Sequence, residues 1–151
     1  MSTGYPYPSY NFTLNILPFN MNPNDCSFQE ISGLNATVQT ETVKEGGTND
    51  SEIKLPTGIS WDPIVCKRGV MGSSALMNWV EGAMSFVFVP MPGVINLKDN
   101  SGKILISWMF TSMYPIGLKT SNLHALPSGG DASILFETLE LHHTGFTRIN
   151  F

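Results

Sequence analysis

Charged residues are scarce in this chain: only 13% of its 151 residues are Asp, Glu, Lys or Arg, against about 25% in an average soluble domain. A compact monomer of this length exposes roughly 7,600 Å² of surface, and few charges are available to cover it. Interface cores of obligate assemblies lose charged residues and gain aromatic residues and Met. The eight Met and nine Phe fit that pattern. A small β-domain with a Ser-, Thr- and Asn-rich surface is the alternative interpretation of the composition.

Basic residues are especially few, and they do not cluster. Lys and Arg number 8 against 12 Asp and Glu, which leaves a formal net charge of −4. Lys67 and Arg68 are the only adjacent cations. Sequence-independent binding to nucleic acid needs clustered cations that displace counterions from phosphate, so the composition argues against that class of function.

Long apolar runs and targeting segments are also lacking. The first ten residues contain neither the charged segment nor the apolar segment of a secretory signal. The longest apolar stretch, Phe86–Leu97, is interrupted by Pro90 and Pro92 and falls short of the roughly 20 residues that span a bilayer. We therefore expect a chain that is made in the cytoplasm, with no signal peptide and no membrane anchor.

Only two cysteines occur, Cys26 and Cys66. In a reducing compartment, two thiols so far apart in the chain are more often small buried hydrophobes than a disulfide. We expect two free, buried thiols.

Residues that could carry out chemistry are few. With three scattered histidines, no Ser/His/Asp or Cys/His arrangement and no motif of paired carboxylates can be argued. The chain is therefore expected not to be an enzyme, and no catalytic residue and no cofactor are predicted.

The nearest approach to a metal site lies on a strand near the C-terminus. Glu140 and His142 would point to one side of that strand and His143 to the other. A third ligand could come only from His124 or a distant carboxylate, and two ligands are too few. No metal is predicted, and the alternative roles for these residues are a polar strand face or a subunit contact.

The hydrophobic pattern predicts a single, mainly β domain over residues 1–151. Phe12, Leu14 and Ile16 alternate with polar residues, as in a strand with one buried face. A hairpin is indicated where a polar turn at residues 99–102 separates two apolar strands. The other predicted strands are Ser27–Val43 with a bulge near Ser32 and Gly33, Ile64–Lys67, Val94–Lys98, Lys103–Thr111 and Ser133–His142.

One amphipathic helix is predicted after Gly72. Ser73 or Ser74 can serve as its N-cap, and apolar residues then recur at helical spacing. Gly82 weakens the last turn and Pro90 prevents continuation. The stripe expected to pack against the sheet consists of Leu76, Trp79, Val80 and Ala83.

Residues 43–58 are rich in Gly, Asn, Asp and Pro, which predicts a long projecting loop or an extended hairpin. Long loops in compact domains are usually functional or disordered. In a ring-forming protein, the natural function of such a loop is to reach the neighbouring protomer. The contact residues expected there are Val43, Lys44, Glu45, Gly46, Gly47, Lys54, Leu55 and Pro56.

Six segments, in one order along nearly the whole chain, resemble the tail tube family of contractile phages and of phage-tail-like extracellular injection systems. They are Ser27–Leu34 (SFQEISGL), Glu41–Gly47 (ETVKEGG), Lys54–Pro56 (KLP), Cys66–Met84 (CKRGVMGSSALMNWVEGAM), Ile106–Leu123 (ISWMFTSMYPIGLKTSNL) and Phe136–Phe146 (FETLELHHTGF). Each segment alone is weak evidence for the resemblance, but six segments in series at the expected spacing are specific to this family.

The resemblance implies a β-barrel of two packed antiparallel sheets with one flanking α-helix. It also implies assembly into hexameric rings that stack into the inner tube of a contractile injection system or contractile phage tail. The implied partners are identical copies, a sheath protein, baseplate or spike proteins and tube-terminating proteins, with effector cargo or phage DNA in the lumen. The implied location is an extracellular phage-tail-like particle or a virion tail. Whether the chain is the main tube subunit or the first ring at the baseplate stays open.

The second hypothesis is a monomeric β-barrel module that binds a small apolar ligand or a glycan in its interior. It is motivated by Trp61, Trp79 and Trp108 and by an aromatic content of 11%.

Overall fold

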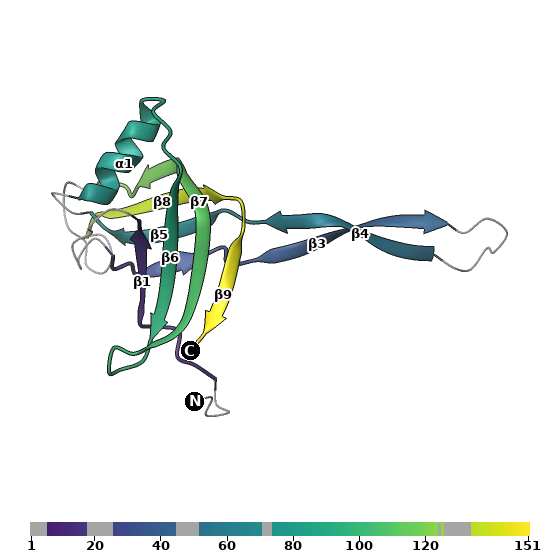
Figure 1. The fold of residues 1–151 in the computed structure, drawn as a ribbon. Helices are drawn as coiled ribbons and strands as arrows, with labels where there is room; N and C mark the ends of the chain where they lie inside the picture. The colour runs from purple at the N-terminus through teal and green to yellow at the C-terminus, as the bar shows by residue number, and fades with distance from the viewer. Residues whose placement is uncertain (1–5, 18–25, 45–51, 71–73, 124, 126–133) are drawn as a thin grey trace.

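The computed structural model describes residues 6–17, 26–44, 52–70, 74–123, 125 and 134–151. Within those ranges the chain forms nine strands and one helix (Figure 1). This confirms the predicted mainly β fold with one flanking helix. The elements in chain order are β1 (Phe12–Ile16), β2 (Glu30–Ser32), β3 (Ala36–Lys44), β4 (Glu52–Trp61), β5 (Ile64–Gly69), α1 (Ala75–Met84), β6 (Met91–Lys98), β7 (Ile104–Thr120), β8 (Phe136–His143) and β9 (Phe146–Asn150).

Seven of the strands form one antiparallel sheet in the order β1-β6-β7-β8-β5-β2, with β9 paired to β7. The first half of β7 pairs with β6 and β9, and its second half, from Met113, pairs with β8. Because β7 runs through both groups, it forms the corner at which the sheet bends into two walls (Figure 1). Strands that switch walls through bends are typical of orthogonally packed sheets.

The sheet curls so far that its two ends meet. Thr13 of β1 forms an isolated antiparallel bridge with Ser27, which precedes β2. The backbone N–H of Leu14 donates to the carbonyl of Cys26 at 2.9 Å. These contacts join the outer strand of one wall to the segment that leads into the outer strand of the other, so the curled sheet is nearly a closed barrel.

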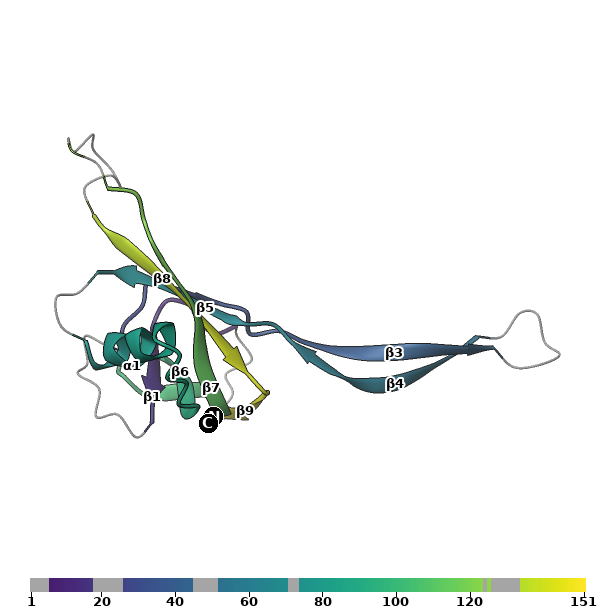
Figure 2. The same ribbon diagram turned by 90° about the horizontal axis from the view of Figure 1, so that it is seen from above.

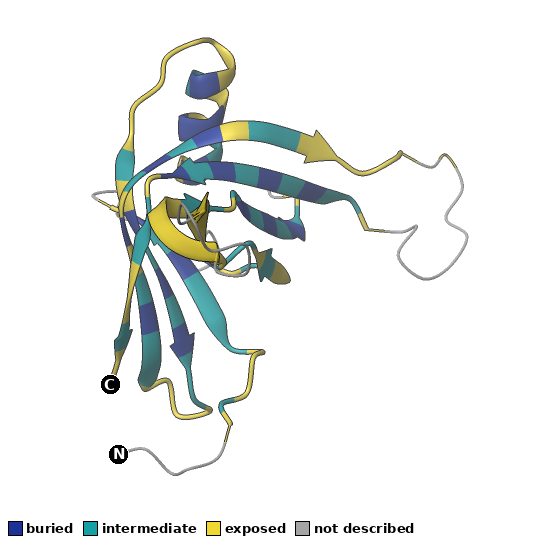
Figure 3. Cartoon of the chain, turned by 90° about the vertical axis from the view of Figure 1, so that its right-hand side faces the viewer, coloured by how far each residue is buried: buried dark blue, intermediate teal, exposed yellow. Residues whose placement is uncertain are grey.

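The core lies inside this curl. Along β5 and β8 every second residue is buried (Figure 3), the period expected of strands with one inward face. The buried cluster draws on β1, β5, β6, β7, β8 and α1. Its members are Leu14, Ile16, Ile64, Cys66, Leu76, Trp79, Val80, Ile95, Phe110, Met113, Leu139 and Leu141.

Helix α1 lies on the flank of the barrel (Figures 1 and 2) and contacts β7. Ser74 is its N-cap, and the Ser74 hydroxyl accepts a hydrogen bond from the Met77 N–H at 3.1 Å. The helix buries four residues, which are those of the stripe expected from the sequence: Leu76, Trp79, Val80 and Ala83. In the described part of the chain, no helix is both long enough and apolar enough to cross a membrane.

The structure departs from the predicted strands at three places. The segment Ser27–Val43 is two strands in two sheets rather than one bulged strand, because the chain turns at Gly33. Strand β7 continues beyond Thr111 to Thr120, and Pro115 is accommodated beside a shift in the pairing with β8. A final strand, β9, follows a turn at Gly145. The alternation of apolar and polar residues did not predict this strand.

Candidate functional site

Strands β3 and β4 pair antiparallel and form an arm that stands away from the barrel (Figures 1 and 2). All nine residues of β3 are exposed, and so are those of β4 from Glu52 to Ile59. The arm is longer than the predicted loop, because its pairing runs from Ala36↔Trp61 to Lys44↔Glu52. It therefore exposes a longer stretch of strand residues than a loop over residues 43–58 would.

Those of the expected contact residues that the structure describes fall in the outer half of this arm. Five of them are exposed strand residues: Val43, Lys44, Lys54, Leu55 and Pro56. The other three, Glu45, Gly46 and Gly47, lie outside the described residues.

A β-bulge interrupts the arm near its middle. Gln39 faces Gly58 and the next residue, Thr40, faces Pro56, so Thr57 is an extra residue on β4. The Thr57 hydroxyl donates to the Gln39 carbonyl at 3.3 Å. Proline has no N–H to give to a ladder and is found in strands at edges and bulges, which is why Pro56 is tolerated beside this irregularity.

The arm is fixed to the barrel by an aromatic cluster at its root. The ring of Trp61 lies edge-on to Phe146 at 4.8 Å and to His143 at 6.0 Å between ring centroids. Gly145, at φ +136°, passes directly under the indole, since a Cβ there would lie 3.0 Å from the Trp61 ring. This close packing sets the direction in which the arm leaves the barrel.

His143 ties the root together with both ring nitrogens. The Gly145 N–H donates to Nδ1 at 3.1 Å, so Nε2 carries the proton and donates to the Asp62 carbonyl at 2.7 Å. Burial lowers the pKa of His143; the hydrogen bond to Asp62 opposes this shift and nearby His142 adds to it. The neutral imidazole is therefore the form that the folded root requires.

The other side of the root depends on a glycine. At Gly33 the chain leaves β2 for the arm with φ +95°, and a Cβ would lie 2.0 Å from the Pro63 carbonyl oxygen. Just beyond it, the Asn35 amide donates to the Asp62 carboxylate at 2.9 Å. Only glycine fits this crossing without moving the backbone of the β4–β5 connection.

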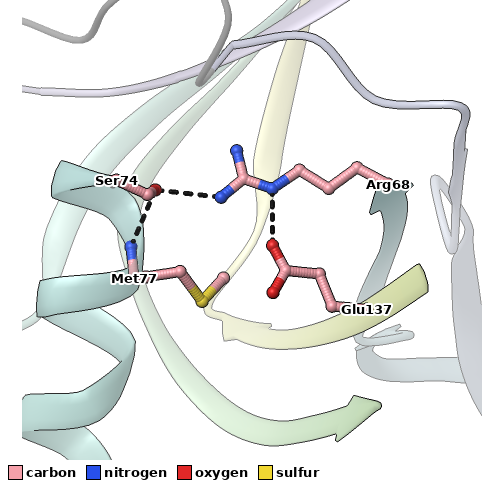
Figure 4. A network of polar contacts seen from close by, with 4 residues as sticks. All are labelled: Arg68, Ser74, Met77 and Glu137. Carbon is pink, nitrogen blue, oxygen red and sulfur yellow. Dashed lines mark hydrogen bonds and ion pairs between the residues drawn. The ribbon is translucent and has the colours of Figure 1, made fainter. Parts of the chain in front are cut away.

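A buried polar network around Arg68 joins the barrel to the start of α1 (Figure 4). Arg68 Nε of β5 donates to Glu137 Oε1 of β8 at 2.8 Å, and the two side chains are 3% and 8% exposed. A second guanidinium nitrogen donates to the Ser74 hydroxyl at 2.9 Å. The same hydroxyl caps α1, so one network holds two strands and the helix in fixed relation.

A second exposed apolar surface follows α1. Phe86 is 87% exposed in the left-handed region, with φ 64°, and Val87, Phe88 and Val89 are also exposed. The Trp79 indole N–H donates to the Val89 carbonyl at 2.8 Å, which anchors this segment to the helix. This segment begins the apolar stretch Phe86–Leu97 that was noted in the sequence.

The residues weighed for metal binding do not gather. Glu140 and His142 lie on the outer face of β8 and His143 on the inner face, as the strand alternation indicated. Among the described residues, no three His, Cys, Asp or Glu side chains are placed to hold a metal ion. His124 lies outside the described residues.

Both cysteines are buried and neither forms a disulfide, as predicted. Burial, partly offset by the positive charge of Arg68, raises the pKa of Cys66 to about 12. The Cys26 thiol donates to the Asn15 side-chain oxygen at 2.7 Å.

The three tryptophans that suggested a ligand-binding interior lie in three different places. Trp79 belongs to the buried face of α1, Trp61 is at the root of the arm, and Trp108 of β7 packs against the core. Each therefore has a packing role of its own, and the indoles do not share one binding surface.

A family model described as T4-like virus tail tube protein gp19 matches residues 8–147. No curated protein sequence matches the chain significantly.

Solved structures share the fold over nearly the whole chain. A chain in the 6-fold symmetrised cryo-EM structure of the anti-feeding prophage baseplate is 26% identical with a TM-score of 0.83, over 99% of this chain and 98% of that one. A chain in the extended sheath-tube complex of the PVC extracellular contractile injection system is 21% identical with a TM-score of 0.80, over 100% and 99%. Hcp1 from Flavobacterium johnsoniae is 16% identical with a TM-score of 0.54, over 94% and 97%.

Proposed function

Since this chain belongs to the T4-like virus tail tube protein gp19 family, we propose that copies of it assemble into hexameric rings that stack into a tube around a lumen. A contact that joins two different surfaces of one molecule closes into a ring when its rotation returns to the start. Ring stacking is then left open, so the tube can grow.

The family match over residues 8–147 is the observation that carries this proposal. The surface supports it, because the chain exposes 9940 Å², about a third more than a compact monomer of its length is expected to expose. With so few charged residues, this surface can be desolvated in subunit contacts at low cost.

The arm is the proposed contact element of the ring and the tube. Its apolar side chains Val43 and Leu55 are 40% and 47% exposed in the single subunit, and burying them against another copy would stabilise the assembly. Lys44, Lys54 and Pro56 lie beside them, and Glu45, Gly46 and Gly47, which come next in the sequence, complete the contact region that we propose.

The role that follows is mechanical rather than catalytic. We propose that a contracting sheath drives the stiff tube into a target envelope, with a baseplate and spike at one end and a terminating protein at the other. The lumen would carry effector cargo or phage DNA. The particle would act outside the cell in which the subunit is made.

Sedimentation and electron microscopy of the purified protein test this function. The expected result is ring-sized particles or tubes whose amount rises with protein concentration, or with added sheath and baseplate proteins. A protein that stays monomeric at high concentration, both alone and with those partners, would refute the proposal.

A further inference from the structure

The imidazole of His143 occupies the place where β4 of the arm returns to the barrel (Figure 1). The side chain is only 3% exposed. Its ring lies edge-on to Trp61 at 6.0 Å and to Phe110 at 4.9 Å between centroids. Since Trp61 is the last residue of β4 and Phe110 belongs to the core, the ring connects one end of the arm to the wall of the barrel.

The two hydrogen bonds of this ring fix its protonation state by geometry. The Asp62 carbonyl oxygen can only accept, so Nε2 must carry a proton. The Gly145 N–H can only donate, so Nδ1 must present a lone pair. A second proton on the ring would set two donors, Nδ1–H and the Gly145 N–H, against each other. The ring therefore cannot become an imidazolium in this position without losing a hydrogen bond.

These two bonds join the two chain segments that form the root of the arm. Asp62 follows β4 directly and leads into β5, and Gly145 lies at the turn between β8 and β9. Loss of the bond at Nδ1 would leave the Gly145 N–H unpaired directly under the Trp61 indole. An unpaired N–H that is shielded from water costs free energy, so the closed root depends on the neutral ring.

The charged groups on the elements packed against the ring offer a second proton little support. The Asp62 carboxylate already accepts a hydrogen bond from the Asn35 amide at 2.9 Å. On β8 itself, Glu140 and His142 lie on the outer face, away from the ring. The other charged residues of the described strands around the ring lie further along those strands: Lys119 of β7, Arg148 of β9, Glu52 and Lys54 of β4, and Lys67 and Arg68 of β5.

The direction of the pKa shift agrees with this geometry. Burial lowers the pKa of His143, nearby His142 lowers it further, and the hydrogen bond to the Asp62 carbonyl only partly offsets the shift. When the root opens and the ring reaches water, the pKa returns towards its ordinary value of about 6.5. Protons therefore favour the open root over the closed one as the pH falls below about 6.5.

We propose that His143 is a pH-sensitive latch that holds the arm in one direction while its ring is neutral and frees the root of the arm when the ring is protonated. The core cluster of the barrel consists of apolar side chains, so the barrel is expected to stay folded when the root opens. Only the consequence for assembly rests on the proposed tube function: a subunit whose arm has lost its direction must order it again before it can join a neighbour, which lowers its apparent affinity.

The size of the effect follows from the ordinary pKa of histidine. Where the closed root excludes the second proton, the ratio of open to closed roots rises about tenfold when the pH is lowered from about 7.5 to about 5.5, and by no more than that.

Hydrogen exchange at the Gly145 amide measures the latch directly, because this N–H is bonded to the ring itself. In dilute wild-type protein, its protection factor, corrected for the intrinsic exchange rate at each pH, should fall about tenfold between those two pH values. The amides of β8, which is paired on both sides, should stay more strongly protected at both. Protection at Gly145 equal to that of β8 would mean that the root opens only when the barrel unfolds, and the latch would be refuted.

Two matched variants assign the effect to one ring. His143→Gln removes the latch, and His142→Gln removes the neighbouring imidazole from the outer face of the same strand. The pH dependence of protection at Gly145 should disappear in the first variant and persist in the second. The same pH dependence in both variants would contradict the proposal.

Nuclear magnetic resonance of the wild-type ring gives a test that needs no variant. The chemical shifts of its two nitrogens should show the Nε2–H form at neutral pH and a pKa below about 6.5. The Nδ1–H form, or a pKa above that value, would overturn the latch even if His143→Gln fails to fold.

Sedimentation of the assembled protein tests the consequence for the tube. The concentration needed for assembly should rise from the higher to the lower pH in wild type and in His142→Gln, and should stay level in His143→Gln. Equal changes in all three proteins would overturn the latch as a control of assembly. Wild-type subunits that show the exchange behaviour described above but assemble at neither pH would support the latch and refute the proposed function.

Discussion

Replacing Glu137 by Gln is expected to lower the free energy of unfolding by about 3 kcal/mol. Removing one partner of a buried ion pair costs about 3–5 kcal/mol, because the other charge is left poorly compensated. Both side chains are less than a tenth exposed, and their ion pair is 2.8 Å long. The lower end of the range applies because the Ser74 hydroxyl at 2.9 Å and the Phe28 ring at 5.3 Å still contact the guanidinium of Arg68.

Urea unfolding followed by tryptophan fluorescence measures this change, since Trp79 of α1 is only 6% exposed and lies in the core. Wild type and variants must be compared at one low protein concentration, because assembly adds to apparent stability. Glu140→Gln is the matched control: it makes the same chemical change on the outer face of the same strand. It should alter the free energy of unfolding by less than about 0.5 kcal/mol.

A double variant separates the cost of a broken pair from the value of the intact one. Arg68→Met combined with Glu137→Leu replaces the ion pair by apolar groups of similar volume, which is often neutral or stabilising. We expect it to be within about 1 kcal/mol of wild type. A cost for Glu137→Gln no larger than that for Glu140→Gln, or a double variant as unstable as the single one, would contradict this account of the ion pair.

Three further predictions concern the helix and the root of the arm. Val80→Asp should cost several kcal/mol and abolish folded, soluble protein, because Val80 is 0% exposed and an unpaired carboxylate would be buried; normal expression and an unchanged melting temperature would contradict this. Gly33→Ala should destabilise the protein by more than about 2 kcal/mol because of its clash with Pro63, whereas Gly58→Ala, with open space around its Cβ, should melt like wild type. The pKa of His143 is lowered in the folded state, so between that lowered pKa and about pH 6.5 the unfolded state binds more protons. The free energy of unfolding should therefore fall as the pH drops below about 6.5. Urea titrations across pH should show that slope in wild type and a flatter one in His143→Gln, and equal slopes would refute the assignment.

The elements that the sequence predicted best are those defined by local spacing. The stripe of α1 follows from the recurrence of apolar residues every three or four positions after a serine cap, and no distant contact is needed to recognise it. The alternation along β8 likewise separated Glu140 and His142 from His143. Local composition also located the arm, since glycines and prolines mark residues 43–58.

The length and the faces of the arm could not be predicted in this way. Pro56 and Gly58 are strand residues here, although both are depleted in strands generally. Their place in β4 depends on pairing with β3 and on the bulge at Thr57, which the sequence pattern of β4 alone does not reveal. The ion pair of Arg68 and Glu137 escaped notice for a similar reason, since 69 positions separate the two residues.

By itself, then, the sequence determined that this is a mainly β chain with one capped helix, few charges and a projecting segment, and which residues of α1 and β8 turn inward. The tertiary structure decided which strands pair, where β7 bends between two walls, and that Gly33 and Trp61 fix the arm to the barrel. The physical reason is that alternation specifies the face on which a side chain lies, whereas a partner is chosen by packing and hydrogen bonding between segments far apart in the chain.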